Sequence, residues 1–351
     1  MSKAAELAKM GEVLTNNQIG GRRNIIINGA MQVAQRSTSL TVGDSTEYKT
    51  LDRYPINING TTAGRATMSQ STDAPNGFGY SMKYDVTTAD TSIGASESFG
   101  FGQRIEGQDV QQFKKGTSDA ERGVLSFYVK GTAKTYIVEI RDDNSRFFSK
   151  TFSVTSSWNR VTIDIPADTT GTIDNDTTTG MNVLFWLHAG SDYTSGTLST
   201  SWATSVNANR MVGCESIFSS TDNELFITGI QLEVGEQATP FEHRSFGEEL
   251  LLCRRYTIQD ALYYAGCFGG GGTIPISSTT FPVKMRAAPT ITYISGGTAS
   301  DGVADYSVTG LNSTQNVADS GARILFTQTG TGAGGRGLDL KAATLRYDAE
   351  L

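Results

Sequence analysis

The stretch that decides the fold is Leu125-Ser126-Phe127-Tyr128-Val129-Lys130, in which large apolar side chains take every second position. Period-two alternation is typical of a strand that buries one face of a sheet. The pattern recurs along the chain, and Gly, Asn, Asp, Ser or Thr residues bound each run. The other runs cover residues 24–29, 136–141, 161–165, 183–188 and 226–233. Because no helical segment separates them, they predict an antiparallel β-sandwich over residues 23–245.

A short connecting helix is predicted over residues 246–256. Ser245 and Glu248 form a capping box at its start, where each side chain can satisfy a free backbone N–H. Beyond it, apolar runs predict a second, smaller β domain over residues 257–351. These runs cover residues 274–276, 291–294, 306–308, 324–327 and 343–347.

The first 22 residues form a separate segment. Ala4, Leu7, Met10 and Leu14 recur at three- and four-residue spacing, which predicts a short amphipathic helix over residues 2–14. An isolated helix of this length is marginal in water, so its apolar face needs a partner. We expect residues 1–22 to serve attachment or oligomerisation, through self-association or through a socket on another protein.

The composition excludes several classes of protein. A formal net charge of −7 without a basic stripe argues against nucleic-acid binding. No apolar run is long enough to span a bilayer, and the N-terminus lacks the apolar core of a signal peptide. The three cysteines, at unrelated spacings, are expected to be reduced thiols in a protein that folds in a bacterial cytoplasm.

Catalysis is not predicted. The two histidines, His188 and His243, have no neighbouring nucleophile motif, and no zinc-binding cysteine pattern occurs. Glutamates on or near the predicted strands keep glycoside cleavage open as an alternative, because paired carboxylates carry that reaction. They are Glu97, Glu106, Glu139, Glu233 and Glu236.

Aromatic side chains are the remaining candidates for a binding site. Flat rings stack on the apolar face of a sugar, while amides and carboxylates bind its hydroxyl groups. The candidate glycan-binding residues are Tyr54, Tyr128, Trp186 and Trp202. Tyr128 and Trp186 fall on the face opposite the most apolar side of their own strands, so both are candidates for exposure.

Several stretches resemble a module of tail-fibre and structural proteins from phages of marine bacteria. The most specific are Arg23-Asn24-Ile25-Ile26-Ile27-Asn28-Gly29-Ala30-Met31-Gln32-Val33-Ala34-Gln35-Arg36 and the segment from Ile227 to Ser245. Leu51-Asp52-Arg53-Tyr54, Gln103-Arg104-Ile105-Glu106-Gly107 and the 125–130 strand lie between them. The module is itself similar to the jelly-roll carbohydrate-binding domains appended to polysaccharide-degrading enzymes. The resemblance implies a jelly roll over residues 23–245.

The same resemblance bears on cofactors. In the carbohydrate-binding family a structural calcium often sits where the first and last strands meet. Asn28, Glu106 and Glu233 are residues that such a site could use here, although they do not match the family's ligands one by one. No other cofactor is expected.

The resemblance implies a virion protein, assembled in the host cytoplasm and released by lysis. The first interpretation is a non-enzymatic tail fibre or receptor-binding protein, a homotrimer that contacts host surface glycans and docks to other virion proteins through residues 1–16. The second is a capsid or collar decoration protein without a specific ligand. The third is a polysaccharide depolymerase.

Overall fold

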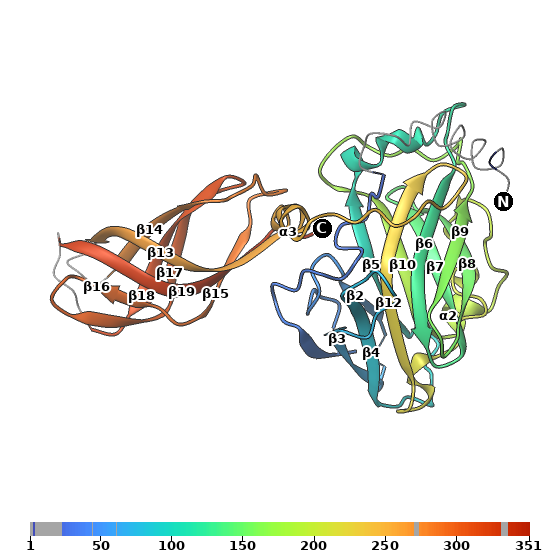
Figure 1. Ribbon diagram of the computed structural model, residues 1–351, viewed down its shortest axis with the longest axis horizontal. Coiled ribbons are helices and arrows are strands. Elements are labelled where there is room, and N and C mark those ends of the chain that lie inside the picture. The colour runs from blue at the N-terminus through green and yellow to red at the C-terminus, as the bar shows by residue number, and fades with distance from the viewer. Residues whose placement is uncertain (1–2, 4–22, 44, 61, 270–273, 331–335) are drawn as a thin grey trace. The chain divides into compact units, whose positions relative to one another are not determined.

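The computed structural model describes residue 3 and residues 23–43, 45–60, 62–269, 274–330 and 336–351. It divides into two compact units, the first ending at Ser245 and the second beginning at Phe246 (Figure 1). The helix predicted over residues 2–14, with Ala4, Leu7, Met10 and Leu14, lies outside the described residues apart from Lys3. In the described part of the chain, no helix is both long and apolar enough to cross a membrane.

The first unit contains two six-stranded sheets whose paired strands are all antiparallel. This confirms the mostly β, jelly-roll sandwich expected from the sequence. In sheet order, the first sheet consists of β1 (Ser39–Val42), β3 (Arg65–Ser71), β4 (Ser81–Thr88), β12 (Glu224–Val234), β6 (Gly123–Gly131) and β9 (Asn159–Ile165). The second consists of β11 (Ala203–Thr204), β8 (Arg146–Val154), β7 (Lys134–Asp142), β10 (Thr179–Ala189), β5 (Ser98–Glu106) and β2 (Ile56–Asn59).

Short helical turns lie in the connections of this unit. They are η1 (Gly107–Asp109), η2 (Gln111–Phe113), α2 (Ser191–Thr194), η3 (Asn207–Asn209) and η4 (Ile217–Ser219).

The core lies between the two sheets, as the alternation of the strands requires. Phe127 of β6 and Phe185 of β10 meet edge to face with their ring centroids 5.1 Å apart, and Phe101 of β5 stacks on Phe185 at 4.8 Å. All three side chains are buried. Burying an aromatic or aliphatic side chain contributes about 1.5–3 kcal/mol each, so these inward positions stabilise the sandwich.

The strand predicted over residues 24–29 is wrong, because side chains replace the strand ladder there. This segment is irregular and buried beside β12. The Gln103 amide accepts a hydrogen bond from the Ile27 N–H and donates one to the Ile27 carbonyl. Asn24 donates to the Ile230 carbonyl and accepts from the Leu232 N–H. These contacts join three of the stretches that carry the family resemblance.

The second unit begins with α3 (Phe246–Arg254), within the predicted connecting helix, and continues as one antiparallel sheet. A pairing between β13 and β19 closes this sheet on itself, so that β13 pairs with β19 along most of its length and with β14 at its end. The fold confirms a second, smaller β domain. Its strands are β13 (Thr257–Gly269), β14 (Ile274–Thr280), β15 (Thr290–Ser295), β16 (Thr298–Ser300), β17 (Asp305–Ala318), β18 (Gly321–Gln328) and β19 (Gly337–Asp348).

Candidate functional site

The outer face of the second sheet carries a hollow beside the outward face of β5. Phe99 and Phe101 enter the core, so the residues between and after them, Gly100 and Gly102, face outward. A Cβ atom at Gly100 would lie 2.9 Å from the ring of Trp186, and one at Gly102 would lie 2.8 Å from Leu184. The two glycines therefore allow the side chains of Trp186 and Leu184, which line the hollow, to pack directly against the backbone of β5.

Cross-strand pairing places the polar residues of the hollow in two rows. Trp186 of β10 pairs with Gly100, which in turn pairs with Asn57 of β2. Asn182 pairs with Arg104 on one side and Arg141 on the other. The hollow has a volume of about 380 Å³, within the range of small-ligand sites. Residues from four strands and from the 190–216 connection line it.

Two hydrogen-bond donors in this hollow meet no acceptor among the described residues. They are the indole Nε1 of Trp186 and the amide Nδ2 of Asn57, both of which are buried atoms. An unsatisfied buried donor costs about 1–3 kcal/mol, which a ligand oxygen would recover. The hollow therefore brings together two buried donors whose hydrogen-bonding capacity is unused among the described residues.

Arg210 closes one side of the hollow and is fixed by a buried ion pair. Its Nε and Nη2 atoms lie 2.8 and 2.9 Å from the two carboxylate oxygens of Glu139. Burial opposes the charge of Arg210, but the hydrogen bonds and charge of Glu139 outweigh it, so the pKa of the guanidinium is raised. The same group lies over the rings of Trp186, at 5.5 Å, and Tyr193, at 5.7 Å.

Stacking of a sugar on Tyr54 or Trp186 is not supported. Trp186 faces outward, but the 190–216 connection covers its ring with Tyr193 and Met211, and only 6% of the residue is exposed. Trp186 therefore offers no open ring face on which a sugar could stack. Tyr54 is 1% exposed and packs edge-on against Phe101 in the core.

Neither Trp202 nor Tyr128 lines the hollow. Trp202 is half-buried, donates from Nε1 to the Pro166 carbonyl at 2.7 Å, and has the Lys115 ammonium 4.0 Å from its ring centroid. Its exposed surface is thus limited by structural contacts. Tyr128 is half-buried on the outer face of the first sheet and contacts Phe78, which also contacts His243. A role for Tyr128 in glycan binding stays a prediction.

The predicted calcium residues have separate structural partners. The Asn28 amide donates to the carbonyls of Val33 and Asp52 and accepts from the Val33 N–H. These hydrogen bonds hold Asn28 itself in the left-handed region, at a φ of 59°. Glu106 accepts from the Gln108 amide, and Glu233 accepts from the backbone and hydroxyl of Thr239. The Asn28 amide in particular is hydrogen-bonded to the backbone around it. Calcium binding by Asn28, Glu106 and Glu233 stays a prediction.

The sequence did not anticipate that His188 would meet two acids. Among the described residues, one group of three or more acidic, histidine or cysteine side chains has the geometry to hold a metal ion, and it consists of Asp90, Glu97 and His188. Ser216 also contacts His188, but its hydroxyl caps η4 by accepting from the Phe218 N–H. This hydrogen bond gives Ser216 a structural role.

The cysteines support no metal cluster in the described part of the chain. Neither Cys214 nor Cys253 forms a disulfide among the described residues, and burial raises the pKa of Cys214 well above its usual value. The side chain of Cys267 lies outside the described residues.

Comparison with known proteins found no matching family model and no similar curated sequence. Several solved structures are similar. A family 4 carbohydrate-binding module is 11% identical, covers 59% of this chain and 98% of its own, and has a TM-score of 0.30. A family 11 carbohydrate-binding module from Clostridium thermocellum is 13% identical, covers 57% of this chain and 99% of its own, and has a TM-score of 0.29. The CBM22-1 xylan-binding domain from Paenibacillus barcinonensis is 10% identical, covers 62% of this chain and 100% of its own, and also has a TM-score of 0.29. Identities and TM-scores this low give no information about which residues of this chain form a binding site.

Proposed function

We propose that the jelly-roll unit is a non-catalytic glycan-binding domain whose site is the hollow on the outer face of the second sheet. The observation that carries this proposal is the pair of unpartnered donors, Trp186 Nε1 and Asn57 Nδ2, that line the same hollow. Sugar hydroxyl and ring oxygens are acceptors of the kind these donors lack.

The other residues of the hollow suit a polyhydroxylated ligand. The Asn182 amide can both donate and accept, and Arg104 and Arg141 flank it on neighbouring strands. A guanidinium donates to two oxygens at once, so it fits vicinal hydroxyl groups or a sugar carboxylate. The ligand class is therefore an oligosaccharide bound chiefly by hydrogen bonds rather than by ring stacking.

Replacing Trp186 with phenylalanine tests the site directly. The ring is kept while the N–H is lost, so we expect glycan affinity to fall about three- to tenfold, the value of one hydrogen bond. An array of neutral and acidic oligosaccharides identifies a ligand, and titration calorimetry measures both proteins. Trp158→Phe is the matched control, because Trp158 donates to Asp73 and does not line the hollow. Equal losses in the two variants would contradict the assignment.

A depolymerase is the second candidate, and Asp143 at the rim of the hollow is the residue that favours it. Burial and the charges of Asp142 and Asp174 raise the pKa of Asp143, as a general acid requires. Its neighbour Asp142 is engaged by Lys115 and the Arg146 N–H, so it is not available as a second catalytic carboxylate. We expect no release of reducing ends from host lipopolysaccharide. Release that Asp143→Asn abolishes would favour the enzyme instead.

The wider role that we propose is that of a homotrimeric tail fibre that presents this site to host surface glycans. The support is the sequence resemblance of residues 23–245 to phage tail-fibre modules, and residues 1–16 are proposed to attach the protein to the virion. Weak sites on three copies would bind with high avidity. Light scattering of the full-length protein should give three times the mass of one chain. A monomer mass would rule out the trimer.

A further inference from the structure

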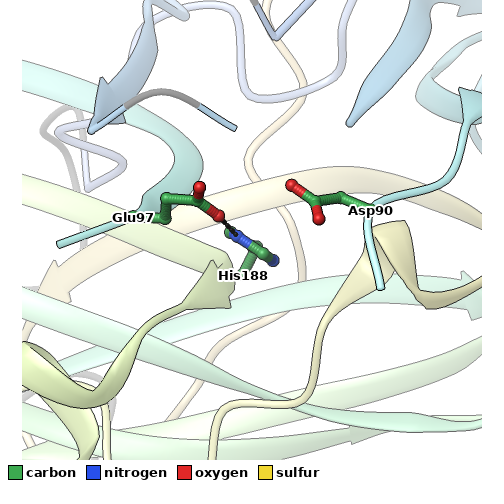
Figure 2. Close-up of side chains that lie close together, drawn as sticks. All are labelled: Asp90, Glu97 and His188. Carbon is green, nitrogen blue, oxygen red and sulfur yellow. Dashed lines mark hydrogen bonds and ion pairs between the residues drawn. The ribbon is translucent and has the colours of Figure 1, made fainter. Parts of the chain in front are cut away.

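Three side chains from distant parts of the sequence converge at one end of the sandwich. Asp90 follows β4, Glu97 precedes β5, and His188 lies near the end of β10. One ligand atom from each lies within 4.8 Å of the others. Figure 2 shows the two carboxylates on either side of the His188 ring, both turned toward it. All three residues are buried, with His188 entirely so.

The cluster carries negative charge without a matching cation. Within the described chain, no lysine or arginine pairs with Asp90 or Glu97, and the carboxylate of Glu97 has its hydrogen-bond contact with the imidazole, at 3.3 Å. Burial lowers the pKa of His188 despite the opposing charges of Glu97 and Asp90. Buried carboxylates are normally paired with a cation or coordinate a metal.

Other buried acidic side chains of the same unit are paired with basic side chains. Glu139 is paired with Arg210, and Asp168 is paired with both Lys115 and Arg146. The contrast indicates that the charge at Asp90 and Glu97 is balanced by something other than a basic side chain.

Outer contacts already orient two of the three groups. The Nδ1 atom of His188 lies 2.7 Å from the Ser216 hydroxyl, which leaves Nε2 for the cluster. Asp90 accepts from the Thr62 hydroxyl at 2.8 Å and from the backbone N–H groups of Ala63 and Ser92 at 2.9 and 3.0 Å. Such secondary hydrogen bonds fix the direction of metal-binding histidines and carboxylates.

We propose that Asp90, Glu97 and His188 bind one divalent transition-metal ion, with Zn²⁺ as the best match. A neutral imidazole with two carboxylates is a donor set that suits zinc, whereas calcium prefers oxygen ligands alone. The 3.3 Å between His188 Nε2 and Glu97 Oε2 is close to the ~3.4 Å expected between ligands of a tetrahedral ion with bonds of ~2.1 Å. The Asp90 carboxylate has an oxygen within 4.8 Å of the other two ligand atoms, and it would move closer to bind the same ion. The ion would tie the 89–97 connection to β10.

Metal titration of the tag-free, full-length protein tests this site. After treatment with EDTA and dialysis, ZnCl₂ should bind at one ion per chain by calorimetry and raise the midpoint of thermal unfolding by a few degrees. CaCl₂ should bind at least tenfold more weakly. Failure of the wild-type protein to take up zinc would overturn the proposal, and tighter binding of calcium would overturn the metal class.

Variants locate the ion. His188→Gln and Glu97→Gln should each weaken zinc binding at least tenfold, and the two are tested separately in case one fails to fold. His243→Gln is the matched control, because this second histidine is exposed and lies on the other sheet's outer face beside Phe78. Unchanged binding in folded Glu97→Gln, or an equal loss in His243→Gln, would place the ion elsewhere.

Discussion

Replacing Glu139 with alanine should lower the free energy of unfolding of the jelly-roll unit by about 3–5 kcal/mol. The substitution leaves the Arg210 guanidinium charged and without its bidentate partner, in a place where the side chain of Glu139 is fully buried and that of Arg210 is 10% exposed. Most of this loss of stability comes from the buried, unpaired charge of the Arg210 guanidinium. Glu139→Leu combined with Arg210→Met should recover much of the loss, because it removes both charges.

Tryptophan fluorescence during urea unfolding of the full-length protein measures this effect. All three tryptophans, Trp158, Trp186 and Trp202, lie in the first unit, so the signal reports on the jelly roll alone. Glu121→Ala is the control, because Glu121 forms an exposed pair with Lys114. Its midpoint should stay close to that of the wild type. An equal shift of the unfolding midpoint in the two variants would show that the buried Glu139–Arg210 pair stabilises the fold no more than the exposed pair does.

The same pair supports the proposed binding site. Arg210 belongs to the connection that covers Trp186, and its guanidinium lies over that ring. Without Glu139, Arg210 would turn toward solvent and the wall of the hollow would loosen. We therefore expect Glu139→Ala to weaken glycan binding even under conditions in which the protein is fully folded.

The strands with strict alternation could be predicted from the sequence because each has one apolar face. The five predicted runs at and around β6, β7, β9, β10 and β12 all coincide with strands. The segment 24–29 reads equally well as a strand, yet its backbone bonds to the Gln103 amide and other side chains. Local sequence cannot reveal such partners, since Gln103 is 76 residues away.

The hollow could be predicted only in part. The alternation Phe99-Gly100-Phe101-Gly102 indicates a strand with one bulky face and one face without side chains, against which neighbouring side chains can pack. The two unpartnered donors come from β2 and β10, and their meeting depends on strand order. Strand order is set by long-range pairing, which a single sequence does not show.

The metal cluster lay beyond prediction for the same reason. Asp90 and Glu97 flank one connection, but His188 follows about 90 residues later and reads as an ordinary strand residue. Only the packing of β10 beside β5 brings it to Glu97. Absence of a local motif therefore says little about sites that a sandwich assembles from several strands.

Replacing Lys115 with methionine should also destabilise the jelly roll by about 3–5 kcal/mol at pH 7. The Lys115 ammonium lies 2.5 Å from Asp142 and 2.6 Å from Asp168, and its side chain is 3% exposed. Methionine would leave two buried carboxylates sharing only Arg146. Lys114→Met is the matched control one residue away, because Lys114 is exposed, and its midpoint should hardly move.

The pH dependence distinguishes this electrostatic effect from lost packing on Trp202. Burial raises the pKa of Asp168, but hydrogen bonds from Arg146 and Lys115 outweigh it and bring the pKa well below its usual value. A carboxyl group with a lowered folded-state pKa stabilises the fold fully above its unfolded pKa of about 3.9 and progressively less as the pH falls below it. The gap between wild type and Lys115→Met should thus be largest near neutral pH and shrink below about pH 4. A gap that stays constant from pH 7 to pH 3 would assign the effect to the contact with Trp202, because neither the Lys115 ammonium nor the indole ring titrates in this range.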